Sequence, residues 1–87
     1  MRVTILYHPN SEHEREVTEY QHDFKKSKGR EPKLISLETV EGADMATLYD
    51  ITKYPAVMVT ADDGSLQHLW QGAPLPLMTE VDAYLSA

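Results

Sequence analysis

The fold of this 87-residue chain is decided by one segment, Ala46-Thr47-Leu48-Tyr49-Asp50-Ile51-Thr52-Lys53-Tyr54-Pro55-Ala56-Val57. Its first part has the apolar spacing of an amphipathic helix, and its last part begins an apolar, β-branched run over residues 56–61. Pro55 stops any helix between them, because proline lacks a backbone N–H and clashes with the preceding turn. The segment therefore predicts a short helix over residues 44–51 that leads into a central strand.

Three further elements are expected on the N-terminal side of this segment. Residues 3–7 form an almost continuous apolar run, which is typical of a strand covered on both faces. Residues 11–28 predict an amphipathic helix that ends at Gly29. Its apolar or aromatic stripe consists of His13, Val17, Tyr20 and Phe24. Residues 33–37 predict a second strand, and Gly42 is interpreted as a break before the next helix.

Two elements are expected on the C-terminal side. Residues 62–65 predict a tight hairpin turn, and residues 66–71 alternate like an edge strand. Residues 77–85 predict a closing helix after a connection that contains Gly72, Pro74 and Pro76. The order is βαβ-α-ββα, which indicates an α/β fold with a four-stranded mixed sheet and helices on both faces. Residues 1–87 are expected to form a single domain.

The composition limits the possible partners and chemistry. Eight Lys and Arg face fourteen Asp and Glu, and the net charge of −6 gives no general attraction to nucleic acid or anionic lipid. No stretch has the roughly 20 apolar residues that span a bilayer. The chain contains no cysteine, so it has no disulfide, thiol nucleophile or Cys-ligated metal. We therefore expect a cytoplasmic monomer with no nucleic-acid or membrane partner.

The order of elements resembles the thioredoxin and glutaredoxin superfamily over nearly the whole chain. In that family the peptide bond before the equivalent proline is cis, so the resemblance implies a cis bond between Tyr54 and Pro55. Gly72 matches a glycine that the family places near its active site. The family carries Cys-x-x-Cys at the start of its first helix, where this chain has Ser11-Glu12-His13-Glu14. The resemblance thus implies a thioredoxin-like fold without thiol-disulfide exchange, with Ser11 and Glu14 at the motif positions.

The residues that replace the cysteines suggest a structural role. A Ser-x-x-Glu pattern ahead of an amphipathic run is typical of a capping box. The Ser11 hydroxyl would accept a hydrogen bond from the Glu14 N–H, and the Glu14 carboxylate would accept one from the Ser11 N–H. We therefore expect Ser11 and Glu14 to stabilise the beginning of the first helix rather than to react.

The resemblance also implies where a ligand would bind. In the family, a groove beside the cis-proline holds an extended polypeptide through the backbone of the preceding residue, a form of strand addition. The corresponding residues here are Asn10, Ser11, Tyr54, Pro55, Gly72 and Ala73. Backbone recognition requires no sulfur, so we expect a redox-inactive module that binds a protein or peptide without a cofactor. An enzyme is the less favoured interpretation.

Two alternatives remain open. In glutathione transferases, which share this fold, a Tyr or Ser near the first helix stabilises a thiolate, and Tyr7 and Ser11 occupy comparable places. The Glu-Ser or Asp-Ser pair that binds glutathione there is missing from residues 71–74, and we expect no second, helical domain. The other alternative is that Ser11 replaces a cysteine of a glutaredoxin-like oxidoreductase.

Two other groups of residues have the chemistry of possible sites. His8, Glu12 and His13 crowd one turn, but their spacing does not suit a helical metal site, so we expect a solvated loop and no metal. Trp70 is the only tryptophan, and it is expected either to cover the core or to anchor an interface.

Overall fold

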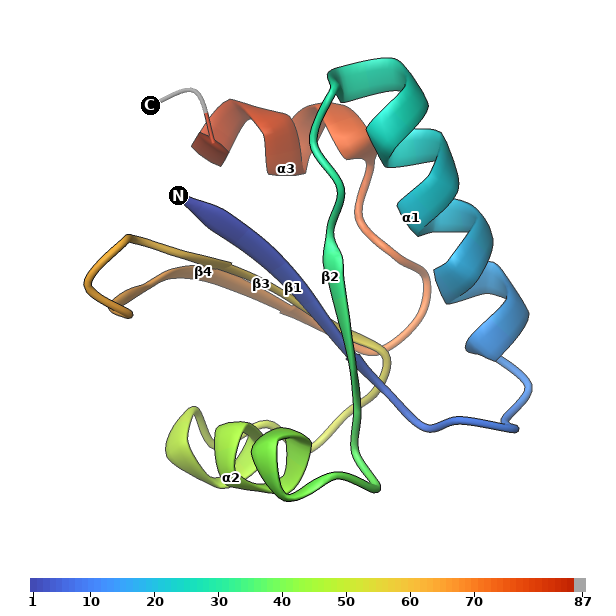
Figure 1. The fold of residues 1–87 in the computed structure, drawn as a ribbon, viewed down its shortest axis with the longest axis vertical. Helices are drawn as coiled ribbons and strands as arrows, with labels where there is room; N and C mark the ends of the chain where they lie inside the picture. The colour runs from blue at the N-terminus through green and yellow to red at the C-terminus, as the bar shows by residue number, and fades with distance from the viewer. Residues whose placement is uncertain (86–87) are drawn as a thin grey trace.

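One mixed sheet organises the protein (Figure 1), in a computed structural model that describes residues 1–85. In chain order the elements are β1 (Arg2–Tyr7), α1 (Glu14–Lys28), β2 (Lys33–Ser36), α2 (Val40–Leu48), β3 (Ala56–Thr60), β4 (Leu66–Gln71) and α3 (Met78–Leu85). The strand order is β2-β1-β3-β4, in which β1 runs parallel to β2 and β3 runs antiparallel to both of its neighbours. The predicted four-stranded mixed sheet is therefore confirmed.

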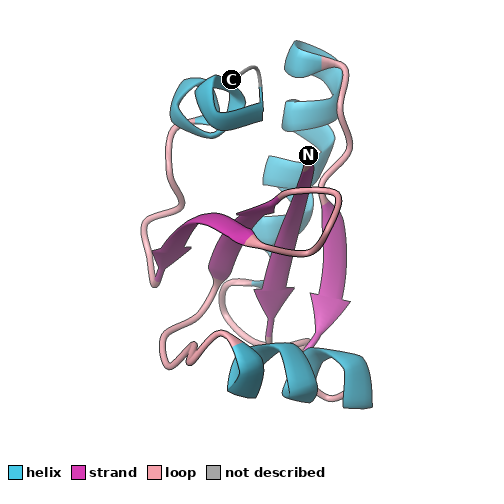
Figure 2. Ribbon diagram, turned by 90° about the vertical axis from the view of Figure 1, so that its left-hand side faces the viewer, coloured by secondary structure: helices cyan, strands magenta, loops and turns pink. Residues whose placement is uncertain are grey.

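Helices cover both faces of this sheet, as the sequence predicts. Figures 1 and 2 show α1 and α3 on one side and α2 on the other. Successive side chains of a strand point to opposite faces, so β1 contributes Val3 and Ile5 to one core and Leu6 to the other. The core under α1 and α3 consists of Val3, Ile5, Val17, Phe24, Val57, Val59, Val81 and Leu85. The core on the α2 side consists of Leu6, Ile35, Ile51, Ala56 and Met58.

The position of α2 differs from the prediction. The helix spans Val40–Leu48 instead of residues 44–51, and Gly42 lies inside it rather than breaking the chain. It begins early because the Thr39 side chain accepts a hydrogen bond from the Gly42 N–H at 3.0 Å and caps the first turn. Gly42 also lies against the end of β2, where a Cβ atom would overlap the Ser36 carbonyl oxygen. The glycine serves a close approach between α2 and β2, which sequence periodicity does not reveal.

The other boundaries agree closely with the prediction. Residues 37, 61 and 77 were expected to belong to regular elements but lie just outside them, and α1 begins at Glu14 instead of residue 11. The turn between β3 and β4 uses Gly64 at a φ of 90°, a conformation that favours glycine. Within residues 1–85, no helix has the length and apolar character needed to cross a membrane.

Candidate functional site

Three loops meet at one end of the sheet. Leu6 of β1 pairs with Ala56 of β3, and Ala56 pairs with Gln71 of β4. The chain that leaves β1, the chain that enters β3 and the chain that leaves β4 therefore lie next to one another. These loops contain all six residues that the sequence assigns to a groove, of which Pro55 is buried and the other five reach the surface.

The loop before β3 contains the expected cis peptide bond. The bond between Tyr54 and Pro55 is cis, and so is the bond between Ala73 and Pro74, which the sequence analysis did not foresee. Gly72, at a φ of 81°, donates its N–H to the Pro55 carbonyl oxygen at 3.0 Å. The loop after β4 is thus fastened directly to the residue that follows the first cis bond.

Gln71 provides a second connection between these two loops. Its side-chain oxygen Oε1 accepts hydrogen bonds from the N–H groups of Thr52 at 2.9 Å and Lys53 at 3.3 Å. Farther along the same loop, the Tyr54 hydroxyl donates to the Ile51 carbonyl at 2.9 Å. Sequence reasoning missed Gln71, although a polar residue at the end of the edge strand, directly before Gly72, was a usable signal.

The predicted capping box at Ser11 and Glu14 is wrong. The Ser11 hydroxyl donates to the His8 carbonyl oxygen, and the N-cap of α1 is His13, which makes no side-chain capping bond. Only a backbone bond connects the predicted pair, from the Glu14 N–H to the Ser11 carbonyl at 3.3 Å. The physical reason is that both groups are engaged elsewhere, the Glu14 N–H with the Ser11 carbonyl and the Ser11 hydroxyl with the His8 carbonyl. In addition, His13 Nε2 accepts from the His8 N–H at 3.1 Å. This bond closes residues 8–13 into a separate turn ahead of the helix.

That turn reaches the cis-proline through aromatic contacts. The His8 ring packs edge-to-face on Tyr54, with 4.9 Å between ring centroids, and lies 6.1 Å from the His13 ring. Asn10 takes a φ of 58° within the turn, a conformation that asparagine tolerates better than most residues. In residues 1–85, no three side chains of the metal-ligating types come together. His8 and His13 make packing and hydrogen-bonding contacts in this turn.

His13 makes this turn sensitive to pH. Burial, and secondly the nearby His8, lowers the pKa of His13 below its ordinary value of 6.5, against the opposing charges of Glu16 and Glu14. Because the folded pKa is depressed, the folded state favours neutral His13. Its contribution to stability is complete above about pH 6.5 and declines as pH falls toward the folded pKa. Protonation also removes the Nε2 lone pair that accepts from His8.

We expect the urea midpoint of the protein to fall between pH 7 and pH 5, and to fall less in His13→Gln. Glutamine offers a side-chain oxygen to the same donor but does not titrate. Titration of the imidazole protons by NMR should give His13 a pKa below 6.5 in the folded protein. A His13 pKa above that value would contradict the assigned state of the turn.

Tyr7 lies apart from Ser11. It is half-buried and packs against the core under α1 and α3, and its carbonyl accepts from the Leu37 N–H at 3.0 Å. No hydrogen bond within the described residues connects it to Ser11, whose hydroxyl is already engaged with His8. The two candidate thiolate-stabilising groups thus make no direct contact.

Tyr20 fixes the far end of the loop that follows β4. Its hydroxyl donates to the Pro76 carbonyl at 2.8 Å. Burial and the Glu80 carboxylate raise the pKa of Tyr20 to about 12, so the phenol keeps its proton and remains a donor at neutral pH. Helix α1 therefore holds the proline-rich connection that carries Gly72 and Ala73.

Comparison with known proteins identifies the architecture. Neither a protein-family model nor a curated protein matches the chain. Among solved structures, it is similar to thioredoxin 1 from the thermophilic eubacterium Thermosipho africanus TCF52B, with a TM-score of 0.72 and 9% sequence identity. The match covers 99% of this chain and 96% of that one. At such low identity the likeness concerns the fold alone, and the chain has a thioredoxin-like fold that contains no cysteine.

Proposed function

We propose that this chain is a redox-inactive thioredoxin-like domain that binds an extended peptide segment of a partner protein. The binding region, which we call the docking surface, comprises Asn10, Ser11, Tyr54, Gly72 and Ala73 together with the buried Pro55. Redox inactivity follows from the absence of cysteine, since thiol-disulfide exchange begins with attack by a thiolate. The backbone beside the cis-proline can still form hydrogen bonds with a peptide, because these bonds do not require sulfur.

The observation that carries the proposal is the free backbone of Tyr54. No hydrogen bond within residues 1–85 uses its N–H or its C=O, although its peptide unit adjoins the cis bond to Pro55. A peptide in extended conformation supplies one acceptor and one donor to such a residue, as in strand addition to a sheet. The docking surface therefore offers a hydrogen-bonding pair that the protein itself leaves unused.

The hydrogen bonds around Tyr54 support binding by reducing its cost. Gln71 holds the N–H groups of Thr52 and Lys53, and Gly72 holds the Pro55 carbonyl. These bonds fix the segment on both sides of Tyr54 before any ligand arrives. Because ordering a loop costs binding free energy, a segment that is already ordered favours affinity.

A peptide selected from a phage-displayed random dodecapeptide library tests the proposal. The synthetic peptide is titrated against the ¹⁵N-labelled chain, and the amide signals of Tyr54 and Gly72 are expected to move with saturation. Gln71→Ala releases the loop before Tyr54, so we expect it to weaken binding by about three- to tenfold, equivalent to about 0.7–1.4 kcal/mol.

The matched control is Gln67→Ala, on the same strand. The Gln67 side chain bonds only to Ser65 of the neighbouring turn, so its removal should leave the affinity unchanged. Equal effects of the two variants, or unmoved Tyr54 and Gly72 signals with every selected peptide, would refute peptide binding at the docking surface. Glutathione binding tighter than about 1 mM at Ser11 and Tyr54 would instead support the glutathione-dependent alternative.

A further inference from the structure

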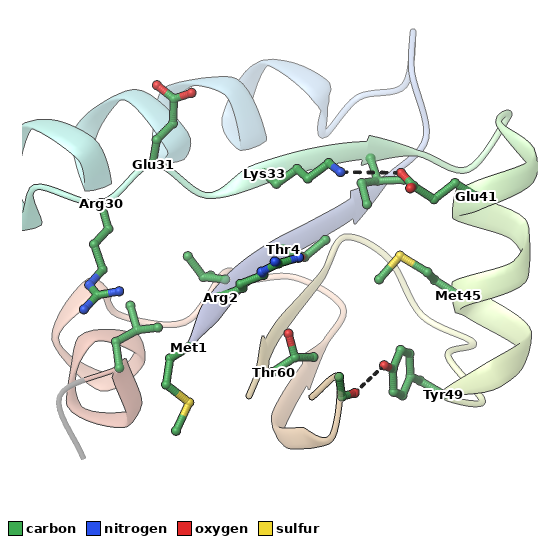
Figure 3. A pocket seen from close by; sticks show the side chains of 14 residues that line it. Met1, Arg2, Thr4, Arg30, Glu31, Lys33, Glu41, Met45, Tyr49 and Thr60 are labelled. Atoms are coloured by element: carbon green, nitrogen blue, oxygen red, sulfur yellow. Dashed lines mark hydrogen bonds and ion pairs between the residues drawn. The ribbon is translucent and has the colours of Figure 1, made fainter. Parts of the chain in front are cut away.

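A hollow of about 520 Å³ lies away from the docking surface, at the edge of the sheet beside the beginning of β1, between α2 and the end of α3 (Figure 3). The hollow exists because β2 and α2, which border it, are short. Strand β2 has four residues and begins opposite Thr4, so it does not pair with Arg2. Helix α2 has nine residues and lies at the end of β2 (Figure 1), which leaves the beginning of β1 uncovered by a helix on the face of the sheet that carries α2.

The floor of the hollow is polar. In β1, Leu6 is fully buried under α2. Thr4, two residues earlier, lies on the same face of the strand. Along β3, Met58 is followed on that face by Thr60. Thr4 and Thr60 are only 6% and 8% exposed, yet neither hydroxyl is hydrogen-bonded to a described residue. Because no fully buried side-chain polar atom of the described chain lacks a partner, both hydroxyls keep some contact with solvent, and both threonines line the hollow.

Cationic side chains surround this floor in a protein of net charge −6. Arg2, Arg30 and Lys33 line the hollow together with two carboxylates, Glu31 and Glu41. Glu41 lies 3.8 Å from the Lys33 ammonium, and Glu31 lies 3.1 Å from Lys25.

Both carboxylates are thus paired with lysines. Within residues 1–85, the guanidinium groups of Arg2 and Arg30 have no carboxylate within 4.0 Å. Among the described residues, Arg2 and Arg30 therefore remain available to an anion at this site.

The opposite wall is apolar. Met45 of α2 and Tyr49, the residue that follows α2, face the sheet across the hollow (Figure 3), and Ile35 of β2 contributes to the same lining. The Tyr49 hydroxyl donates to the Gly64 carbonyl at 2.8 Å, which ties the end of α2 to the turn between β3 and β4. A ligand would therefore meet a fixed apolar wall on one side and the arginines on the other.

We propose that this hollow binds a small amphiphilic anion. The planar guanidinium fork of Arg2 or Arg30 suits the two oxygens of a carboxylate or phosphate, and the threonine hydroxyls can donate to the same group. The apolar body of the ligand lies against Met45 and Tyr49. A volume of about 520 Å³ falls within the range of pockets that hold small organic ligands. The site is separate from the docking surface, and the two proposals stand independently.

Titration with octanoate, followed by NMR of the full chain, tests this site. We expect saturable shifts of the Thr4, Met45 and Thr60 amides with a Kd of about 1 mM or tighter. Octylammonium carries the same apolar body with the opposite charge, and inorganic phosphate carries charge without the body. Both are expected to bind at least about tenfold more weakly than octanoate. The amides of Tyr54 and Gly72 should stay in place throughout.

A pair of double variants isolates the contribution of the arginines. Arg2→Gln with Arg30→Gln is expected to weaken octanoate binding by at least about fivefold, because two cations leave the site. The control, Arg15→Gln with Lys26→Gln, removes the same net charge from the exposed surface of α1 and should change binding by less than about twofold. Equal weakening in both variants, octylammonium binding as tight as octanoate, phosphate binding as tight as octanoate, or no saturable binding would each overturn the proposal.

Discussion

Gly42→Ala is expected to lower the free energy of unfolding by about 2–4 kcal/mol, even though alanine is the better helix former. A Cβ atom at residue 42 would overlap the Ser36 carbonyl oxygen, and it would lie 2.9 Å from the Ser36 carbonyl carbon and 3.2 Å from Leu37 Cα. All three are backbone atoms, so relief requires α2 to move away from β2. Helix propensity alone favours alanine by about 1 kcal/mol, so the two effects have opposite signs.

Chemical denaturation of the two forms, with a control in the adjacent residue, measures the difference. Ala43 is exposed on the same helix, and Ala43→Gly should cost about 1 kcal/mol through helix propensity alone. If Gly42→Ala stabilised the protein, α2 would not be held against the end of β2. Since α2 also forms the apolar wall of the anion hollow, Gly42→Ala should weaken octanoate binding as well.

Gly42 also shows how far the sequence predicts this fold. The strands follow from local patterns of apolar residues, and the mixed sheet follows from their order, because a parallel pair requires a crossover helix. A glycine needed for close packing between α2 and β2 looks the same in the sequence as a glycine that breaks a helix. The prediction therefore misplaced α2 by about one turn while the topology remained correct.

The candidate site was predictable to a similar extent. Pro55 and Gly72 have local signatures, and the register of β1, β3 and β4 brings them together. The capping box failed because the Ser11 hydroxyl bonds back to the His8 carbonyl, a contact across a turn that a capping pattern does not include. The cis bond before Pro74 was also missed, since the sequence alone does not determine the isomer of most X-Pro bonds. The anion hollow depends on the lengths of β2 and α2 and on side-chain pairing, and only the assembled fold shows it.

Phe24→Ala is the substitution expected to destabilise the protein most directly. Phe24 is the only phenylalanine of the chain, it is fully buried, and with Val17 it forms the buried side of α1. Truncating a buried phenylalanine to alanine costs about 3–5 kcal/mol through lost transfer free energy and the cavity that remains. A domain of this size has a total stability of about 4–13 kcal/mol, so this loss would remove a large share of it.

Two further variants make this result interpretable if Phe24→Ala does not fold. Phe24→Leu keeps most of the apolar volume and should cost about 1–2 kcal/mol, whereas His22→Ala on the exposed side of α1 should change stability by less than about 0.5 kcal/mol. Similar losses of stability in Phe24→Leu and His22→Ala would contradict the packing of α1 on the sheet. Helix α1 also holds the Pro76 carbonyl through Tyr20, so it supports the loop that carries Gly72. Partial loosening of α1 in Phe24→Leu should therefore weaken peptide binding at the docking surface.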